Sequence, residues 1–251
     1  MEIIAITSIK GGVGKTTTAV HLAYLSAAAG WRTLLWDLDP QGGATYSLGV
    51  DASLNGAAKR LVRGEQELHD AIVATPFDNL DLLPGDLSLR RMDLHLHERK
   101  HPTERLLKMS RSLRSRYAAL FIDCAQGMSL LSENVLTAAD AIVVPLIPSP
   151  LSVRMLDQLS GFVAERGWTD LVVLPFFSMV DRRRQLHQEF IAATRERFPG
   201  ILRTEVPYWS EIERMSVRRA PLSAIAPRSA AAQIYLSLWT EIDERLQRAR
   251  A

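Results

Sequence analysis

The residues best suited to chemistry lie near the start of the sequence, where an apolar run gives way to glycines, a lysine and threonines. The segment Ile3–Thr18 reads IIAITSIKGGVGKTTT; its β-branched start predicts a buried strand, and Thr16 onward predicts a helix. Glycines at such a junction let backbone N–H groups turn inward, and the helix dipole adds to their attraction for anions. Lys15 would reach the phosphates and the Thr16 hydroxyl would bind Mg²⁺. The segment therefore predicts a polyphosphate site.

The loop departs from the general phosphate-loop pattern at one place, because that pattern has glycine where this chain has Ile9. A second lysine, Lys10, stands beside it at the entrance to the loop. The segment resembles the deviant Walker A box of the ParA/MinD family of P-loop ATPases. The resemblance implies nucleotide binding by Lys10, Gly11, Gly12, Val13, Gly14, Lys15, Thr16 and Thr17. In that family the first lysine reaches phosphates bound by the partner subunit, which implies a homodimer closed around ATP, with Lys10 and Lys15 both acting in catalysis.

Two carboxylates follow the next predicted strand, Thr33–Trp36. Because ligands of open parallel sheets sit at the carboxyl ends of the strands, we expect Asp37 and Asp39 to face the same phosphates as Lys15. Taken alone, the pair is also compatible with a helix cap or a solvated turn. The segment 37–42, DLDPQG, is similar to the switch I segment of ParA-like ATPases. The resemblance implies that Asp39 activates the attacking water and joins the magnesium site, with Asp37 beside it.

A further apolar strand, 118–123, ends in Asp123. In P-loop NTPases an aspartate holds Mg²⁺ opposite the loop threonine. Thr16, Asp39 and Asp123 are therefore our candidate metal ligands, and ATP with Mg²⁺ are the expected cofactors. A buried strand can also end in an aspartate that only caps the following turn.

The residues after Asp123 depart from the family. ParA-like proteins usually have two prolines in this switch II segment, whereas this chain has Ala125 and Gln126. The departure bears on how nucleotide state is coupled to dimerisation and to DNA affinity. Cys124, the single cysteine, is expected to be a small core residue, and it excludes an internal disulfide or an all-cysteine metal site.

The rest of the chain alternates predicted strands with predicted helices. A strand followed by a turn is predicted over 80–85, and further strands are predicted at 141–145, 171–177 and 201–207. Helices are predicted at 16–29, 86–97, 103–116, 130–139, 148–166 and 211–217. Strands that are apolar on both faces predict a mostly parallel sheet covered on both sides. Since no linker or repeat divides the chain, we expect residues 1–251 to form one α/β domain. This twisted sheet with helices on both faces is also the fold that the P-loop ATPase resemblance implies.

Composition narrows the possible partners. The 251 residues are 47% hydrophobic, with no signal peptide and no apolar run long enough to span a membrane, so we expect a cytoplasmic protein. Net charge is only +2, yet Lys and Arg outnumber Asp and Glu by nine to three in 87–116 and by ten to five in 182–228. This asymmetry predicts a basic face.

The resemblance and the basic face together imply a switch ATPase. ATP would close the dimer, the dimer would bind DNA without sequence preference on the nucleoid, and an adaptor protein would stimulate slow hydrolysis while a plasmid, chromosome region or protein cargo is positioned. The candidate DNA contacts are Arg182, Arg183, Arg184, Arg218, Arg219 and Arg228. Scattered surface charge is the plain alternative for these arginines.

Two other functions remain open at this point. A MinD-like protein would bind membrane through an amphipathic C-terminal helix, and Ile234, Leu238, Ile242 and Leu246 recur at helical spacing there, although such a stripe also suits packing on the sheet. A metabolic ATP-dependent ligase on the same scaffold would need a second pocket for its acceptor, and we find no motif for one.

Overall fold

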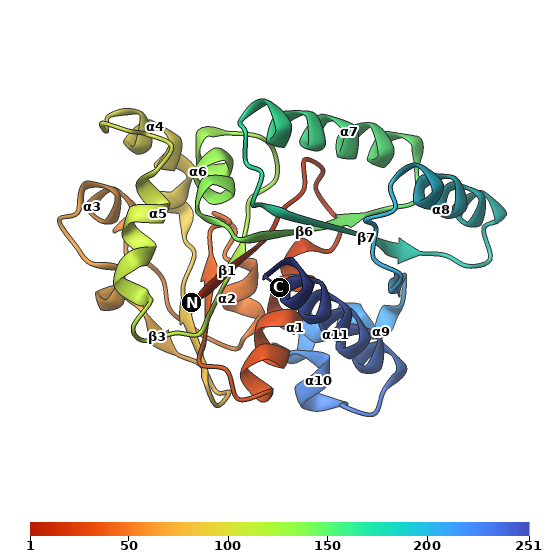
Figure 1. The fold of residues 1–251 in the computed structure, drawn as a ribbon. Coiled ribbons are helices and arrows are strands. Elements are labelled where there is room, and N and C mark those ends of the chain that lie inside the picture. Colours follow the sequence, from red (N-terminus) through yellow and green to blue (C-terminus); the bar gives the residue numbers. More distant parts are fainter. Residues whose placement is uncertain (251) are drawn as a thin grey trace.

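The computed structural model describes residues 1–250; Ala251, the last residue of the predicted domain, lies outside the described residues. Within that range a sheet of eight strands, in the order β3-β4-β2-β5-β1-β6-β7-β8, lies between two layers of helices (Figure 1). The strands are β1 (Glu2–Ile6), β2 (Thr33–Asp37), β3 (Val73–Ala74), β4 (Leu80–Leu83), β5 (Ala119–Asp123), β6 (Ala141–Leu146), β7 (Val172–Val180) and β8 (Glu205–Pro207). Every neighbouring pair is parallel except β3 with β4. The predicted, mostly parallel sheet is confirmed.

The helices follow the strands as expected from an alternating chain. They are α1 (Lys15–Ala28), α2 (Gly43–Ser47), α3 (Ala58–Arg63), α4 (Met92–His97), α5 (Arg105–Ser110), α6 (Leu130–Ala138), α7 (Pro150–Glu165), α8 (Gln185–Arg197), α9 (Ser210–Arg218), α10 (Leu222–Ile225) and α11 (Ala230–Arg250). Three 3₁₀ turns join them, η1 (Leu68–Ala71), η2 (Leu87–Arg91) and η3 (Arg111–Leu113). In Figure 1, α6, α7 and α8 lie on one side of the sheet, and α1 and α11 lie on the other.

Two hydrophobic cores result, one on each face of the sheet. Strand β1 is buried along its whole length; Ile3 and Ala5 join one core, and Ile4 and Ile6 join the other. Because side chains alternate along a strand, a strand covered on both sides is expected to be apolar on both faces, as residues 3–6 of this one are. The stripe on α11 lies in the second core, with Leu238, Ile242 and Leu246 fully buried or nearly so. The stripe therefore packs on the sheet.

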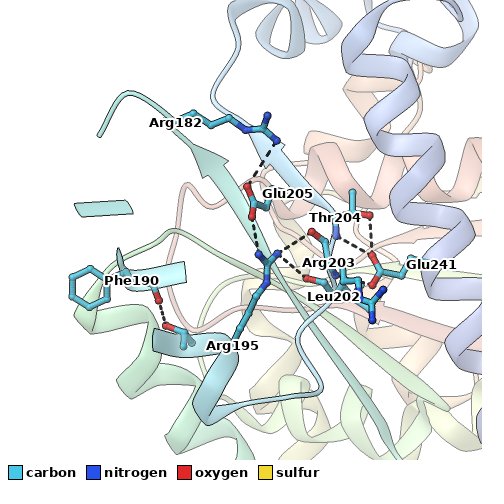
Figure 2. Close-up of polar contacts among 9 residues, drawn as sticks. Arg182, Phe190, Arg195, Leu202, Arg203, Thr204, Glu205 and Glu241 are labelled. Atoms are coloured by element: carbon cyan, nitrogen blue, oxygen red, sulfur yellow. Dashed lines mark hydrogen bonds and ion pairs between the residues drawn. The ribbon is translucent and has the colours of Figure 1, made fainter. Parts of the chain in front are cut away.

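The last predicted strand is shorter than its apolar pattern suggests. We predicted 201–207, but β8 begins only at Glu205. The backbone N–H groups of Arg203 and Thr204 donate to the carboxylate of Glu241 on α11, at 2.7 and 2.9 Å, as Figure 2 shows. Those donors are thus engaged by a side chain of a helix, which the local sequence does not reveal.

The helices predicted at 86–97 and 103–116 are also interrupted. The first begins as the 3₁₀ turn η2, where the Asp86 side chain accepts a hydrogen bond from the Ser88 N–H. The second ends as α5 at Ser110 and continues as η3. None of the helices formed by the described residues combines the length and the hydropathy needed to cross a membrane. The chain ends lie close together, since Arg250 pairs with Glu2.

Candidate functional site

The glycine-rich loop leaves β1 at its carboxyl end and enters α1, as the sequence predicts. Gly14 has φ +88°, and a Cβ there would lie 3.2 Å from Ser178 Oγ, so the position suits glycine for both backbone and space. Within residues 1–250 no side chain caps the start of α1, and its first turn holds no acid. The first N–H groups of α1 are therefore free of side-chain acceptors, and the positive end of the helix dipole faces the loop. This geometry favours an anion.

A cleft of about 580 Å³ opens over this loop. Its lining includes most of the predicted nucleotide-binding residues and Asp39: Gly11, Gly12, Gly14, Lys15, Thr16, Thr17, Asp39, Pro40, Gln41, Arg90, Ala125, Gln126 and Met179. Val13 is buried beneath the loop at 2% exposure. Lys10 is half-buried and, among residues 1–250, is not part of the lining of this cleft. The structure thus brings Lys15, Thr16 and Asp39 together, and leaves Lys10 outside.

Asp37 holds in place the loop that follows β2, residues 38–42, here called the acidic loop. Its carboxylate accepts hydrogen bonds from the Thr45 N–H and hydroxyl, each at 2.8 Å, and from the Asp39 N–H at 3.2 Å. Burial raises the pKa of Asp37 to about 6, although the bonds from Thr45 act in the opposite direction. Asp39 is half-buried, lies at the cleft, and accepts the Gln41 N–H at 2.9 Å. The geometry separates the two acids, because Asp37 anchors the loop while Asp39 faces the cleft.

Gly85, which follows β4, makes this arrangement possible. Its N–H donates to the Thr45 hydroxyl oxygen at 3.0 Å. A Cβ at Gly85 would lie 2.8 Å from the carbonyl oxygen of Asp39 and 2.9 Å from Cγ of Asp37. No larger residue fits without moving the acidic loop. From the sequence we read residue 85 only as part of a turn, since the close approach depends on two distant segments.

Asp123 is the most unusual group of the site. Strand pairing places it directly beside Asp37. It is fully buried, and neither of its carboxylate oxygens has a hydrogen-bond partner in the described part of the chain. Burial and then the charge of Asp37 raise the pKa of Asp123 well above its ordinary value, while Thr16 and Lys15 act in the other direction. An unpaired buried carboxylate is costly, so this position is suited to a cation.

The residues present fit Mg²⁺. This ion usually keeps several waters and is bound by one or two carboxylates together with substrate phosphates. Asp123 offers two free oxygens next to the Thr16 hydroxyl, and Asp39 lines the cleft above them. No group of three or more His, Cys, Asp or Glu side chains within 1–250 could hold a metal by itself. The site therefore fits a metal bound jointly with phosphates.

A second hollow of about 170 Å³ adjoins the first and shares Gly14, Thr17 and Met179 with it. Its remaining lining is largely aromatic and apolar: Ser178, Val206, Pro207, Tyr208, Trp209, Ile212, Glu213, Ser216 and Tyr235. Met179 has φ +55° and lies at an irregularity in the pairing of β7 with β8. Bulges of this kind often turn a side chain towards a site. Flat apolar walls beside a phosphate site suit a base, and the sequence predicted none of these contacts individually.

Two further residues of the cleft are not among the site residues that the sequence predicted. The carboxamide of Gln126 lies directly against Gly11 and leaves no room there for a Cβ. Arg90 enters the lining from η2. Both can be located only after the fold brings the ends of β4 and β5 to the loop. Cys124 is buried, as predicted, and burial raises the pKa of its thiol.

The six candidate DNA-binding arginines differ in what they already contact. Arg183 bonds Asp181 at 3.1 Å, and Arg182 lies 3.9 Å from Glu205, which is also held by Arg195 (Figure 2). Arg219 is the most engaged: its guanidinium donates to the carbonyls of Tyr46 and Val50 and to Asp51. The three that are exposed and form no ion pair within residues 1–250 are Arg184, Arg218 and Arg228.

Comparison with known proteins identifies relatives over the whole chain. Residues 1–166 match a family model described as an AAA domain. The sporulation initiation inhibitor protein Soj of Bacillus subtilis is 32% identical, over 96% of this chain and 98% of that protein. The chromosome partitioning protein ParA of Caulobacter vibrioides is 30% identical, over 98% and 95% of the two chains. The septum site-determining protein MinD of Pyrococcus horikoshii, solved with Mg-ADP, superposes with a TM-score of 0.80 at 24% identity, over 99% and 98%.

Proposed function

This chain belongs to the ParA/MinD family of P-loop ATPases, and on that premise we propose that it is a slow ATP-dependent switch that dimerises on ATP, binds DNA without sequence preference and positions a cargo. The observation that carries the proposal is the unpaired buried carboxylate of Asp123 beside an open phosphate loop. A binding site for phosphate alone would not need that carboxylate, whereas hydrolysis of Mg·ATP does.

Different residues of the cleft would hold the phosphates, the metal ion and the attacking water. The free N–H groups at the start of α1 and the buried Lys15 would hold the phosphates, and Thr16 with Asp123 would hold Mg²⁺. Mg²⁺ bound there would offset the negative charge that develops on the transferred phosphoryl group. Asp39 would orient the attacking water. Its backbone is held by the hydrogen bond from its N–H to Asp37 and by close packing against Gly85. Catalysis of this kind depends on positioning and charge.

Dimerisation would complete the site. Lys10 stands at the entrance of the loop but outside the cleft of its own subunit. A lysine in that place is available to the nucleotide of a second copy, which supports the role in trans that the family resemblance implies. Hydrolysis would remove the phosphate that both subunits contact and so release the dimer.

The DNA and partitioning part of the proposal rests on charge and on relatives. Arg184, Arg218 and Arg228 are exposed and unpaired within the described residues, as contacts to phosphates require. One relative is named for chromosome partitioning. The burial of the α11 stripe at Leu238, Ile242 and Leu246 counts against membrane binding through that helix. An adaptor protein that stimulates hydrolysis belongs to the proposal as well.

One experiment tests the function directly. The purified chain is incubated with Mg·ATP or Mg·ADP, with or without plasmid DNA, at low and moderate salt; ATP hydrolysis and sedimentation are then measured. We expect slow hydrolysis, a dimer only with ATP, and DNA association that requires ATP and weakens with salt. Lys10→Ala should remain monomeric with ATP, whereas Lys59→Ala, an exposed lysine far from the loop in sequence, should behave like the parent.

Each part of the proposal can fail separately. A parent protein that hydrolyses ATP and dimerises but ignores DNA at low salt contradicts DNA binding, and liposomes and small-molecule acceptors would then be tested for the MinD-like and ligase alternatives. A Lys10→Ala protein that dimerises and hydrolyses ATP like the parent contradicts the role of Lys10 in trans.

A further inference from the structure

One wall of the phosphate cleft carries a cationic side chain whose role neither the sequence nor the comparisons assign. Arg90 lines the cleft together with residues of the glycine loop and is exposed to solvent. Its backbone is held firmly, because Leu89 next to it is buried at 3% exposure and the Asp86 carboxylate accepts the Ser88 N–H at 2.9 Å. The guanidinium therefore projects from a fixed turn at the edge of the site.

Arg90 has no carboxylate partner within the part of the chain that the structure describes. Among residues 1–250 it forms no ion pair, even though Asp39 lines the same cleft. Many other arginines in the chain are paired, including Arg183 with Asp181 and Arg219 with Asp51. An unpaired guanidinium at a cleft built for phosphates is well matched to a phosphate oxygen, which it can bind through two parallel N–H donors.

Two neighbouring side chains, Gln126 and Arg91, lack the combination of positive charge and access to the cleft that Arg90 has. Gln126, another long polar side chain of the lining, is neutral and lies against Gly11. Arg91 is the next residue of η2 and is also exposed, but it does not line the cleft. Two adjacent arginines of the same turn thus differ in one respect, which is access to the site.

We propose that Arg90 binds the terminal phosphate of ATP within its own subunit, in the cleft that it lines together with Lys15. The proposal rests on the proposed function, since it requires the cleft to hold a nucleoside triphosphate. ADP lacks the phosphate that Arg90 would contact. The residue would therefore let a single subunit distinguish ATP from ADP before any partner arrives.

Equilibrium binding tests the proposal without relying on hydrolysis. The full chain, kept dilute enough to remain monomeric, is titrated with a non-hydrolysable ATP analogue or with ADP, both with Mg²⁺. We expect Arg90→Ala to weaken binding of the analogue about tenfold, because a charge-assisted contact is lost at an exposed site, and to change ADP binding less than about twofold. Arg90→Lys should restore part of the loss, and Arg91→Ala should match the parent for both nucleotides.

The possible failures are distinct. Equal affinity of the parent and Arg90→Ala for the analogue overturns the proposal while leaving the proposed function intact. An equal loss for the analogue and ADP places the contact elsewhere on the nucleotide and also overturns it. A loss that appears only at concentrations where the analogue dimerises the protein assigns Arg90 to the partner's nucleotide. A parent chain that binds neither nucleotide contradicts the proposed function itself, and this proposal with it.

Discussion

The buried carboxylate of Asp123 destabilises the folded protein unless a cation lies beside it. Neither oxygen is hydrogen-bonded within the described residues, and burial together with Asp37 raises its pKa well above the ordinary value. A raised pKa in the folded state means that the folded chain binds more protons than the unfolded chain, so stability falls as pH rises from the ordinary pKa through the raised one. The acid is retained at this position despite that cost, which is the expected compromise at a functional site.

Asp123→Asn should therefore stabilise the metal-free protein while removing its response to Mg·ADP. The substitution keeps the shape and deletes the charge, and we expect a gain of about 2 kcal/mol at pH 8, or roughly 5 °C in Tm for a chain of this size. Thermal unfolding in EDTA and in Mg·ADP measures both effects.

The matched control for that substitution is Asp78→Asn, which changes an exposed acid. It should leave Tm in EDTA within about 1 °C and preserve the stabilisation by Mg·ADP. If Asp123→Asn instead lowers Tm in EDTA, the carboxylate has a partner in solution and the interpretation of an unpaired acid is wrong.

At the scale of elements, one buried histidine joins α1 to the C-terminal helices α10 and α11. His21 on α1 accepts the Leu222 N–H of α10 at Nε2, at 3.1 Å, while Nδ1 donates to the Thr17 carbonyl at 2.7 Å. Its ring stacks on the ring of Tyr235 of α11, with 3.9 Å between the two ring centroids. Both nitrogens are thus used by the neutral ring. Tyr235 also lines the second hollow, so the stacking of His21 on Tyr235 connects α1 with the wall of that hollow.

Protonation of His21 should loosen this junction. Burial lowers the pKa of His21 from 6.5 to about 4. The unfolded chain then binds more protons than the folded chain between these values, so stability contributed by the neutral ring is fully present above pH 6.5 and is lost as pH falls to 4. The loss is at most about 3 kcal/mol.

The test compares urea unfolding of His21→Gln with that of the parent at pH 7.5 and pH 4.5. The difference in unfolding free energy should shrink at the lower pH, because only the parent carries the titrating ring. His97→Gln, at an exposed position of α4, should follow the parent at both values. A difference that stays constant with pH would show that His21 titrates alike in the folded and unfolded states.

Patterns within one element could be predicted from the sequence, whereas contacts between elements could not. The strand that ends in Asp123 and the glycine loop are local signals, and both were predicted correctly. The start of β8 depends on Glu241 of a distant helix, and the fit of Gly85 depends on the loop after β2. Arg90 lines the cleft only because the ends of β4 and β5 converge on the phosphate loop. A propensity or a motif carries no information about such pairings.

At the scale of the whole molecule, the same limit applies to charge. The excess of arginine in 182–228 predicted a basic face, but counts do not distinguish free side chains from paired ones. Arg183 and Arg219 are bound to Asp181 and Asp51. Arg184 has no such partner among the described residues and remains available to an external phosphate. The segment 87–116 has a larger excess, with nine Lys and Arg against three Asp and Glu. A groove of about 610 Å³ there is lined by Arg99, Lys100, Arg105, Lys108 and Arg111 together with Glu98, His101, Glu104 and Leu107.

The two sets of basic residues lead to different predictions for DNA binding. We expect the triple reversal Arg184→Glu, Arg218→Glu and Arg228→Glu to weaken ATP-dependent DNA association at least tenfold. It should also flatten the dependence of log affinity on log salt by up to about 3 for each subunit of the bound dimer, since each lost phosphate contact removes roughly 0.9 from the slope. The affinity for Mg·ATP, measured in the same preparation, should not change, because none of the three residues lines the phosphate cleft.

A reversal of equal size elsewhere separates local contacts from net charge. Arg99→Glu, Lys100→Glu and Lys108→Glu alter the other groove and change the charge of the chain by the same amount. Long-range repulsion alone would weaken DNA binding similarly in both triple variants. It would change the slope of log affinity against log salt only a little at moderate salt, where charges more than about 10 Å apart are screened. Direct phosphate contacts would affect only the variant that carries them. A loss confined to the second variant would move the DNA-binding surface to the segment between α4 and α5 and contradict the assignment of Arg184, Arg218 and Arg228.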